Sequence, residues 1–178
     1  MNNELKRISA RVKHLKGRVW LFWDPSTWAS SERKALRDCF EWDGETRLMF
    51  VAENPSEGKV PILGRVFFKA LEAEGLGGAL VTDLIKVRSL RPGKEYWITE
   101  HARILDDEVN VVKPILIVAV GGRTERVLRS GDSTLDVPVE RVIHYSQTSH
   151  EALRKSIARV ARIYRAMIQQ RAIEPKKR

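Results

Sequence analysis

Short runs of almost purely apolar residues alternate along this chain with longer segments of helical character. The apolar runs predict four strands, at residues 47–52, 78–85, 115–120 and 137–143. The segments between and after them predict helices at residues 61–75, 95–112, 122–130 and 149–171. Strands that are apolar throughout and separated by helices are typical of a mostly parallel sheet with helices on both faces. The sequence therefore predicts an α/β fold.

The N-terminal part predicts a helix, a strand and a second helix. Apolar residues recur with helical spacing over residues 2–16, at Leu5, Ile8, Val12 and Leu15. The apolar segment 18–28 predicts a short strand that ends at Asp24-Pro25. A serine then caps a predicted helix that runs to about Phe40.

The chain contains no internal repeat and no low-complexity region, and Gly75 is expected to end the helix at 61–75. We expect a single domain over residues 1–178. Its parts are a core at about 47–150, an N-terminal helix and strand at 2–42, a C-terminal helix at 149–171 and a basic tail at 172–178.

Composition narrows the class of protein. The chain has 32 Lys and Arg against 23 Asp and Glu, a formal net charge of +9, which favours a polyanionic partner and nucleic acid first. The alternative is that the basic segments near both ends are only solvated. The single cysteine, Cys39, and four scattered histidines favour neither a metal site nor a cofactor. No apolar run approaches the about 18–20 residues that span a bilayer, so we expect a cytoplasmic protein without membrane contact.

Polar residues follow each of the four predicted strands. In parallel sheets, ligands bind outside the carboxyl ends of the strands, so these residues are expected at one site. They are Glu53-Asn54-Pro55-Ser56 after the first strand, Thr82, Asp83, Lys86 and Arg88 at the second, Gly121-Gly122-Arg123-Thr124 after the third, and 144–149 after the fourth.

Each cluster also has a purely structural explanation. Pro55 holds Asn54 on a rigid turn, where its amide can orient a water, but the segment is equally a common turn. His144 can donate a hydrogen bond to a developing oxyanion, or it can be a satisfied buried polar group. The serines and threonine after it can bond phosphate or cap a helix. The two glycines can cradle phosphate beside Arg123 or serve only packing.

Five segments, taken in order, resemble the uracil-DNA glycosylase superfamily. They are "FVAENPS" (50–56), "PILGRVFFKAL" (61–71), "LVTDLIKVRSLRPG" (80–93), "VKPILIVAVGGRTERVL" (112–128) and "VIHYSQTS" (142–149). The resemblance implies a three-layer α/β/α sandwich around a mostly parallel four-stranded sheet. It also implies a DNA partner, flipping of a base into a pocket at the strand ends, and cleavage of its N-glycosidic bond.

The resemblance assigns roles to individual residues. Asn54 matches the residue that positions the hydrolytic water, with Glu53 beside it. His144 matches the histidine that stabilises negative charge on the departing base. Asp83 matches the residue that recognises the base edge. The remaining matched positions are expected to contact substrate (Ala52, Pro55, Ile62) or DNA (Ser56, Ser146, Thr148, Arg123, Lys86).

Five positions depart from the family pattern. Thr148 stands near the position of the apolar residue that fills the gap left by a flipped base. Ala52 replaces a glycine, Ile62 replaces the aromatic residue that stacks on the base, and Tyr145 replaces a proline. Asp83 replaces an asparagine, and an ionised carboxylate only accepts hydrogen bonds. It therefore suits a base that presents an amino group at that edge, as cytosine, adenine and guanine do.

Three hypotheses follow. The chain is an active DNA glycosylase with altered base preference. Alternatively, it is a catalytically inactive protein of the same fold that binds nucleic acid or a nucleobase. A third alternative is an unrelated small-molecule α/β enzyme or structural protein. We expect a monomer without bound metal.

Overall fold

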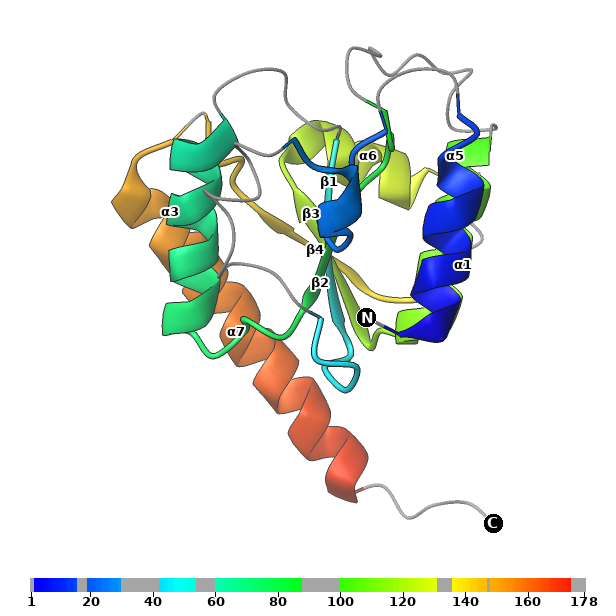
Figure 1. Cartoon of the computed structure of the whole chain (residues 1–178). Helices are drawn as coiled ribbons and strands as arrows, with labels where there is room; N and C mark the ends of the chain where they lie inside the picture. Colours follow the sequence, from blue (N-terminus) through cyan, green and yellow to red (C-terminus); the bar gives the residue numbers. More distant parts are fainter. Residues whose placement is uncertain are drawn as a thin grey trace.

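The computed structural model describes residues 2–15, 19–29, 42–53, 60–87, 100–130, 136–146 and 148–173, with the backbone alone at 60–65. Four strands form one sheet, β1 (Leu48–Ala52), β2 (Leu80–Asp83), β3 (Leu116–Val120) and β4 (Val139–Val142). The sheet has the order β2-β1-β3-β4, and all three pairings are parallel (Figure 1). The predicted parallel sheet is confirmed.

The register brings the carboxyl ends of the strands to one edge. Ala52 of β1 pairs with Asp83 of β2, and Val120 of β3 pairs with Val142 of β4. The central strands β1 and β3 are buried throughout, which explains why their sequences are continuously apolar. Residues that directly follow the strands therefore meet at this edge.

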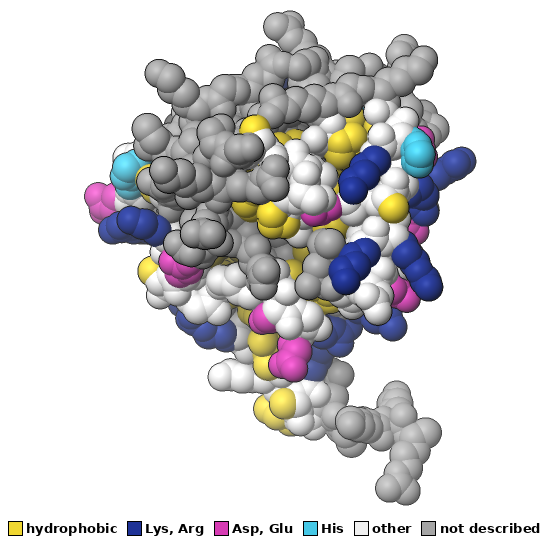
Figure 2. Space-filling view, in the orientation of Figure 1, with side chains coloured by type: hydrophobic (Ala, Val, Ile, Leu, Met, Phe, Trp, Pro, Cys, Tyr) yellow, Lys and Arg dark blue, Asp and Glu magenta, His cyan; other side chains and the backbone are white. Residues whose placement is uncertain are grey.

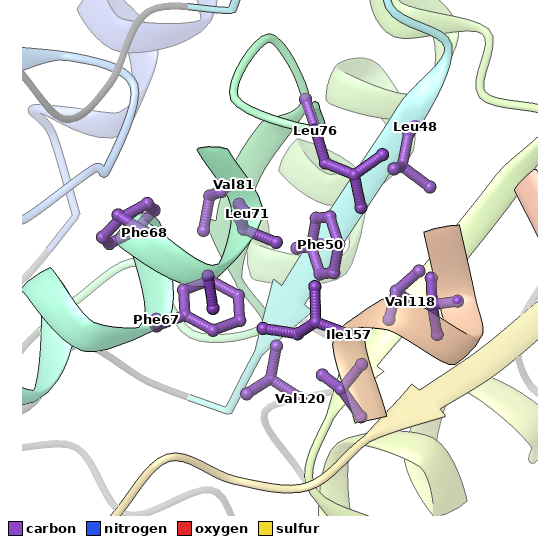
Figure 3. Packing of buried hydrophobic residues seen from close by; sticks show 14 of the residues in the cluster. Leu48, Phe50, Phe67, Phe68, Leu71, Leu76, Val81, Val118, Val120 and Ile157 are labelled. Atoms are coloured by element: carbon purple, nitrogen blue, oxygen red, sulfur yellow. The ribbon is translucent and has the colours of Figure 1, made fainter. Parts of the chain in front are cut away.

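One face of the sheet is covered by α3 (Val60–Ala73) and α7 (His150–Ile173), which contact each other. Phe50 of β1, Phe67 of α3, Val120 of β3 and Ile157 of α7 belong to one buried cluster on this face and point toward one another (Figure 3).

The other face is covered by α1 (Asn3–Val12), α5 (Glu100–Val112) and α6 (Gly122–Arg129). Met49 and Val51 belong to this second cluster, whereas Leu48, Phe50 and Ala52 belong to the first. The alternation follows from the period of two residues in a strand. The structure is thus the expected three-layer α/β/α sandwich.

The helix ends follow local chemistry. Gly75 has φ +67°, and the bonds from its N–H to Glu72 O (2.9 Å) and from Leu76 N–H to Leu71 O (2.8 Å) form a Schellman motif. The prediction that Gly75 ends α3 is confirmed. The described part of α5 starts at Glu100, and the start predicted for this helix at 95 lies outside the described residues.

The short strand predicted within segment 18–28, ending at Asp24-Pro25, is wrong. Over the described residues 19–28, only isolated bridges occur, Val19 with Val87 and Leu21 with Asp24, followed by the short 3-10 helix η1 (Pro25–Thr27). The Asp24 carboxylate accepts from Ser26 N–H at 2.9 Å and caps η1, so the chain turns instead of extending. The apolar side chains are buried in this irregular segment, and the helix predicted after it lies outside the described residues.

In the described part of the chain, no helix has the length and apolar character needed to cross a membrane.

Candidate functional site

The carboxyl edge of the sheet brings together residues from all four strand ends. Glu53 follows β1, Asp83 ends β2, Gly121 follows β3 and His144 follows β4 by two residues. They come from segments that are up to 91 residues apart in the chain, and the parallel register alone aligns them. This convergence is what the sequence predicted for an α/β sheet.

His144 has a defined tautomer. Its Nδ1 lies 3.2 Å from the backbone nitrogen of Ser146 and 2.6 Å from the Ser146 Oγ. A backbone N–H can only donate, so Nδ1 is the acceptor. The neutral ring therefore carries its proton on Nε2. Ser146 holds the imidazole so that Nε2–H is the available donor.

The surroundings of His144 favour its neutral form. Burial lowers the pKa of His144 below its usual value, and the nearby Glu53 carboxylate opposes this shift by raising it. The ring packs against Gly121, where an added Cβ would lie 3.3 Å from the Cβ of His144, and Gly121 has φ +96°. A neutral imidazole N–H held in this way can donate a hydrogen bond to negative charge that develops on a substrate.

The balance between burial and Glu53 can be tested by titration. Glu53→Gln should lower the pKa of His144 further, because it removes the negative charge that stabilises the imidazolium. NMR titration of the His144 ring measures this pKa, and Glu74→Gln, at the end of α3, is the control that should leave it unchanged. An unchanged or higher pKa in Glu53→Gln would contradict this arrangement.

Because the pKa of His144 is lowered in the folded chain, this histidine makes the free energy of unfolding depend on pH. Below its ordinary pKa the unfolded chain binds more protons at this histidine than the folded chain does. The contribution is therefore complete above about pH 6.5 and is lost as the pH falls toward the pKa of the folded state.

Glu53 is itself held by an arginine. Arg123 Nη1 of α6 lies 3.1 Å from Glu53 Oε1, with side-chain exposures of 66% and 23% respectively. The prediction placed both residues at the site, and the structure brings them together as an ion pair. The Arg123 side chain remains largely accessible to solvent while it holds Glu53.

Tyr145 lies against His144, and Asp83 is close to Tyr145. Asp83 is 2% exposed. Burial raises the pKa of the Tyr145 phenol, and the charge of Asp83 raises it further, which indicates that the two groups are close. Tyr145 stacks on His144 with ring centroids 4.4 Å apart and contacts Phe67 at 5.7 Å. The row Phe67–Tyr145–His144 therefore joins the hydrophobic core to the site.

Tyr145 is the site residue that the sequence did not assign. Its ring is partly exposed at this edge, whereas Phe67, which contacts it from the core, is 2% exposed. The signal in the sequence that could have identified Tyr145 as part of the site is its position directly after His144. Ile62 stands where the family pattern has an aromatic residue, and its side chain lies outside the described residues.

The predicted contact of Lys86 with DNA is wrong, because it requires a residue on the surface and Lys86 is buried. Its side chain is 0% exposed, and Nζ donates to Thr82 Oγ1 (2.7 Å), to Asp83 O (2.5 Å) and to Glu108 Oε2 (2.7 Å). Glu108 accepts further bonds from Thr82 and from Trp23 Nε1 at 2.9 Å. This buried network, residues 23, 82, 86 and 108, fixes the end of β2 that carries Asp83.

The other residues predicted to contact substrate or DNA differ in their exposure to solvent. Asn54, Pro55 and Ser56 lie outside the described residues. Ala52 is buried in the core at the end of β1, and Ser146 is exposed beside His144. Thr148 is half-buried and lies next to Ser149, whose Oγ accepts from Ala152 N–H at 3.2 Å and caps α7. The capping alternative therefore holds for Ser149.

Basic side chains do not gather at one place on the face shown in Figure 2, where Lys and Arg are spread around the body. Among the described residues, no group of three His, Cys, Asp or Glu side chains is placed to hold a metal ion. No protein-family model matches the chain, and no curated protein matches it at a significant level.

Proposed function

We propose that this chain is a divergent DNA glycosylase-like protein that binds DNA and cleaves the N-glycosidic bond of a damaged or deaminated base. The observation that carries the proposal is His144, a neutral imidazole whose Nε2–H is the available donor at the carboxyl edge of a parallel sheet. The ordered resemblance of the five sequence segments to the uracil-DNA glycosylase superfamily supports it.

The proposed reaction assigns one task to each group. The C1′–N bond breaks, and its electron pair leaves with the base. The Nε2–H of His144 stabilises the negative charge on that base. Glu53, already beside His144, stabilises the positive charge that develops on the sugar. A water positioned by Asn54 adds to C1′, and the proton that this water loses is taken up by the departed base, so the products are an abasic sugar and a neutral free base.

Asp83 is the proposed determinant of base preference. Asp83 ends β2 close to Tyr145, and this position suits a contact with the edge of a flipped base that stacks on the phenol ring. An ionised Asp83 accepts hydrogen bonds only, so the preferred base presents an amino group there.

A panel of oligonucleotides tests the proposal. Duplex and single-stranded DNA carrying uracil, hypoxanthine, xanthine, or T and U mismatches is incubated with the protein, and abasic sites are scored by strand cleavage in alkali. We expect abasic sites with at least one base, and their loss in Asn54→Ala. Absence of cleavage on every substrate would remove the proposed activity.

One contact favours a second candidate, a catalytically inactive protein that binds nucleic acid or a nucleobase. The ion pair between Glu53 and Arg123 ties up the carboxylate that the reaction would use. This candidate predicts DNA binding without abasic sites in the same panel. An unrelated small-molecule enzyme would show neither.

DNA binding is expected to weaken as salt rises. Each phosphate contact contributes about −0.9 to the slope of log K against log salt concentration, because bound cations are released. Arg123→Ala should reduce the magnitude of the slope by about one unit. Arg171→Ala, which removes an exposed arginine from the last turn of α7, should not. Titration of a fluorescent duplex measures both, and a slope near zero for the wild type would exclude phosphate contacts.

A further inference from the structure

β4 forms an edge of the sheet. It pairs with β3 on one side, and in the described part of the chain no strand pairs with the other. Ile143, directly after β4, is 42% exposed, and Val139 is half-buried. An edge strand with accessible apolar side chains is a place where a strand of another molecule can add.

The register identifies which backbone groups of β4 face outward. Ile117 N–H donates to Pro138 O (3.0 Å) and Gly121 N–H donates to Val142 O (2.9 Å). Because alternate residues of a strand direct their N–H and C=O to opposite sides, Pro138, Glu140 and Val142 face β3. The residues that face outward are Val139, Arg141 and Ile143.

Each of these three outward residues has a backbone group bonded to a side chain from α6 or α7. Arg129 Nη2 donates to Val139 O at 2.5 Å, and Arg159 Nη2 donates to Arg141 O at 2.8 Å. Ser156 Oγ accepts from Ile143 N–H at 3.1 Å. The bonded backbone groups therefore lie on alternate residues of β4, at each position where the backbone faces outward.

Ion pairs hold the two arginines in place. Arg159 Nη1 lies 2.8 Å from Glu140 of β4, so one guanidinium group bonds both the carboxylate and the adjacent backbone. Arg129 Nε lies 3.3 Å from Glu125, which also pairs with Arg141 Nη1 at 3.0 Å. Partly exposed pairs add little stability each, so their main effect here is geometric.

We propose that Arg129, Ser156 and Arg159 close the β4 edge against strand addition by a second copy of this chain. An added strand needs Val139 O, Arg141 O and Ile143 N–H as hydrogen-bonding partners. The bonds of these groups to the three side chains must therefore break before a strand can add. Antiparallel pairing of two β4 strands also places like charges opposite each other in its central registers, Arg141 facing Arg141 or Glu140 facing Glu140. Self-pairing is thus opposed by the backbone caps and by charge.

The proposal predicts that an uncapped edge self-associates. The triple variant Arg129→Ala, Arg141→Thr, Arg159→Ala removes two caps and the facing charge. Its mass in light scattering after size exclusion should double or increase further with concentration, while its circular dichroism stays that of the wild type. The control triple variant Arg126→Ala, Arg154→Ala, Arg162→Ala loses the same charge from exposed positions of the same helices and should remain at the mass of the wild type.

Two results would overturn the proposal. One is a folded triple variant with the mass of the wild type at every concentration. The other is equal association of the control variant, which would assign the effect to lost charge. A second measurement does not depend on the triple variant: Ser156→Ala should speed hydrogen exchange at the Ile143 amide and leave the Gly121 amide, bonded within the sheet, unchanged. Unchanged exchange at Ile143 would contradict the cap.

Discussion

Lys86→Met should lower the free energy of unfolding by about 3–5 kcal/mol. The substitution leaves the Glu108 carboxylate in the interior without its cation, and both side chains are 0% exposed. It also removes the donor to Asp83 O at the end of β2. Urea unfolding monitored by tryptophan fluorescence measures the change, because Trp23 donates to the same carboxylate.

A double substitution separates the loss of stability caused by the unpaired buried charge from the loss caused by changed packing. Lys86→Met combined with Glu108→Leu removes both charges and should recover a large part of the loss, because two apolar side chains of similar volume replace the ion pair. Lys69→Met, at an exposed position of α3, should change stability by less than about 0.5 kcal/mol. A loss of the same small size in Lys86→Met would show that the network does not hold the end of β2.

His144→Ala should reduce the rate of base excision by roughly 100- to 1,000-fold under single-turnover conditions. The variant removes the donor that stabilises the departing base and leaves the fold of β4 intact. His150→Ala is the matched control, since His150 is an exposed histidine that begins α7, and it should keep the rate of the wild type. Equal rates in His144→Ala and the wild type would remove His144 from the proposed reaction.

The sheet was predictable because each strand is a continuous apolar run, and parallel order follows from the helices between the runs. The segment 18–28 has the same apolar character and still does not join the sheet. Its course depends on Asp24, which caps η1 and bonds Ser9 of α1, a contact across 15 residues. Local apolar content cannot report such a contact.

The site was predictable in outline only. Polar residues after strands indicated the sheet edge, and Glu53, Asp83 and His144 do converge there. The burial of Lys86 depends on Glu108, 22 residues further along the chain. A signal for it existed, because Glu108 falls on the apolar face of α5 with Ile104, Leu105 and Val112, where a charged residue needs a buried partner. Sequence spacing does not identify that partner.

Direct detection of the released base tests the proposed function most directly. The wild type and the double variant Asn54→Ala, His144→Ala are incubated with duplex oligonucleotides that each carry one altered base, and free bases are identified by mass spectrometry. Base excision by this site predicts that the wild type releases a free base and leaves one abasic site for each base, while the double variant releases none. Release of no base by the wild type, or equal release by the double variant, would contradict it.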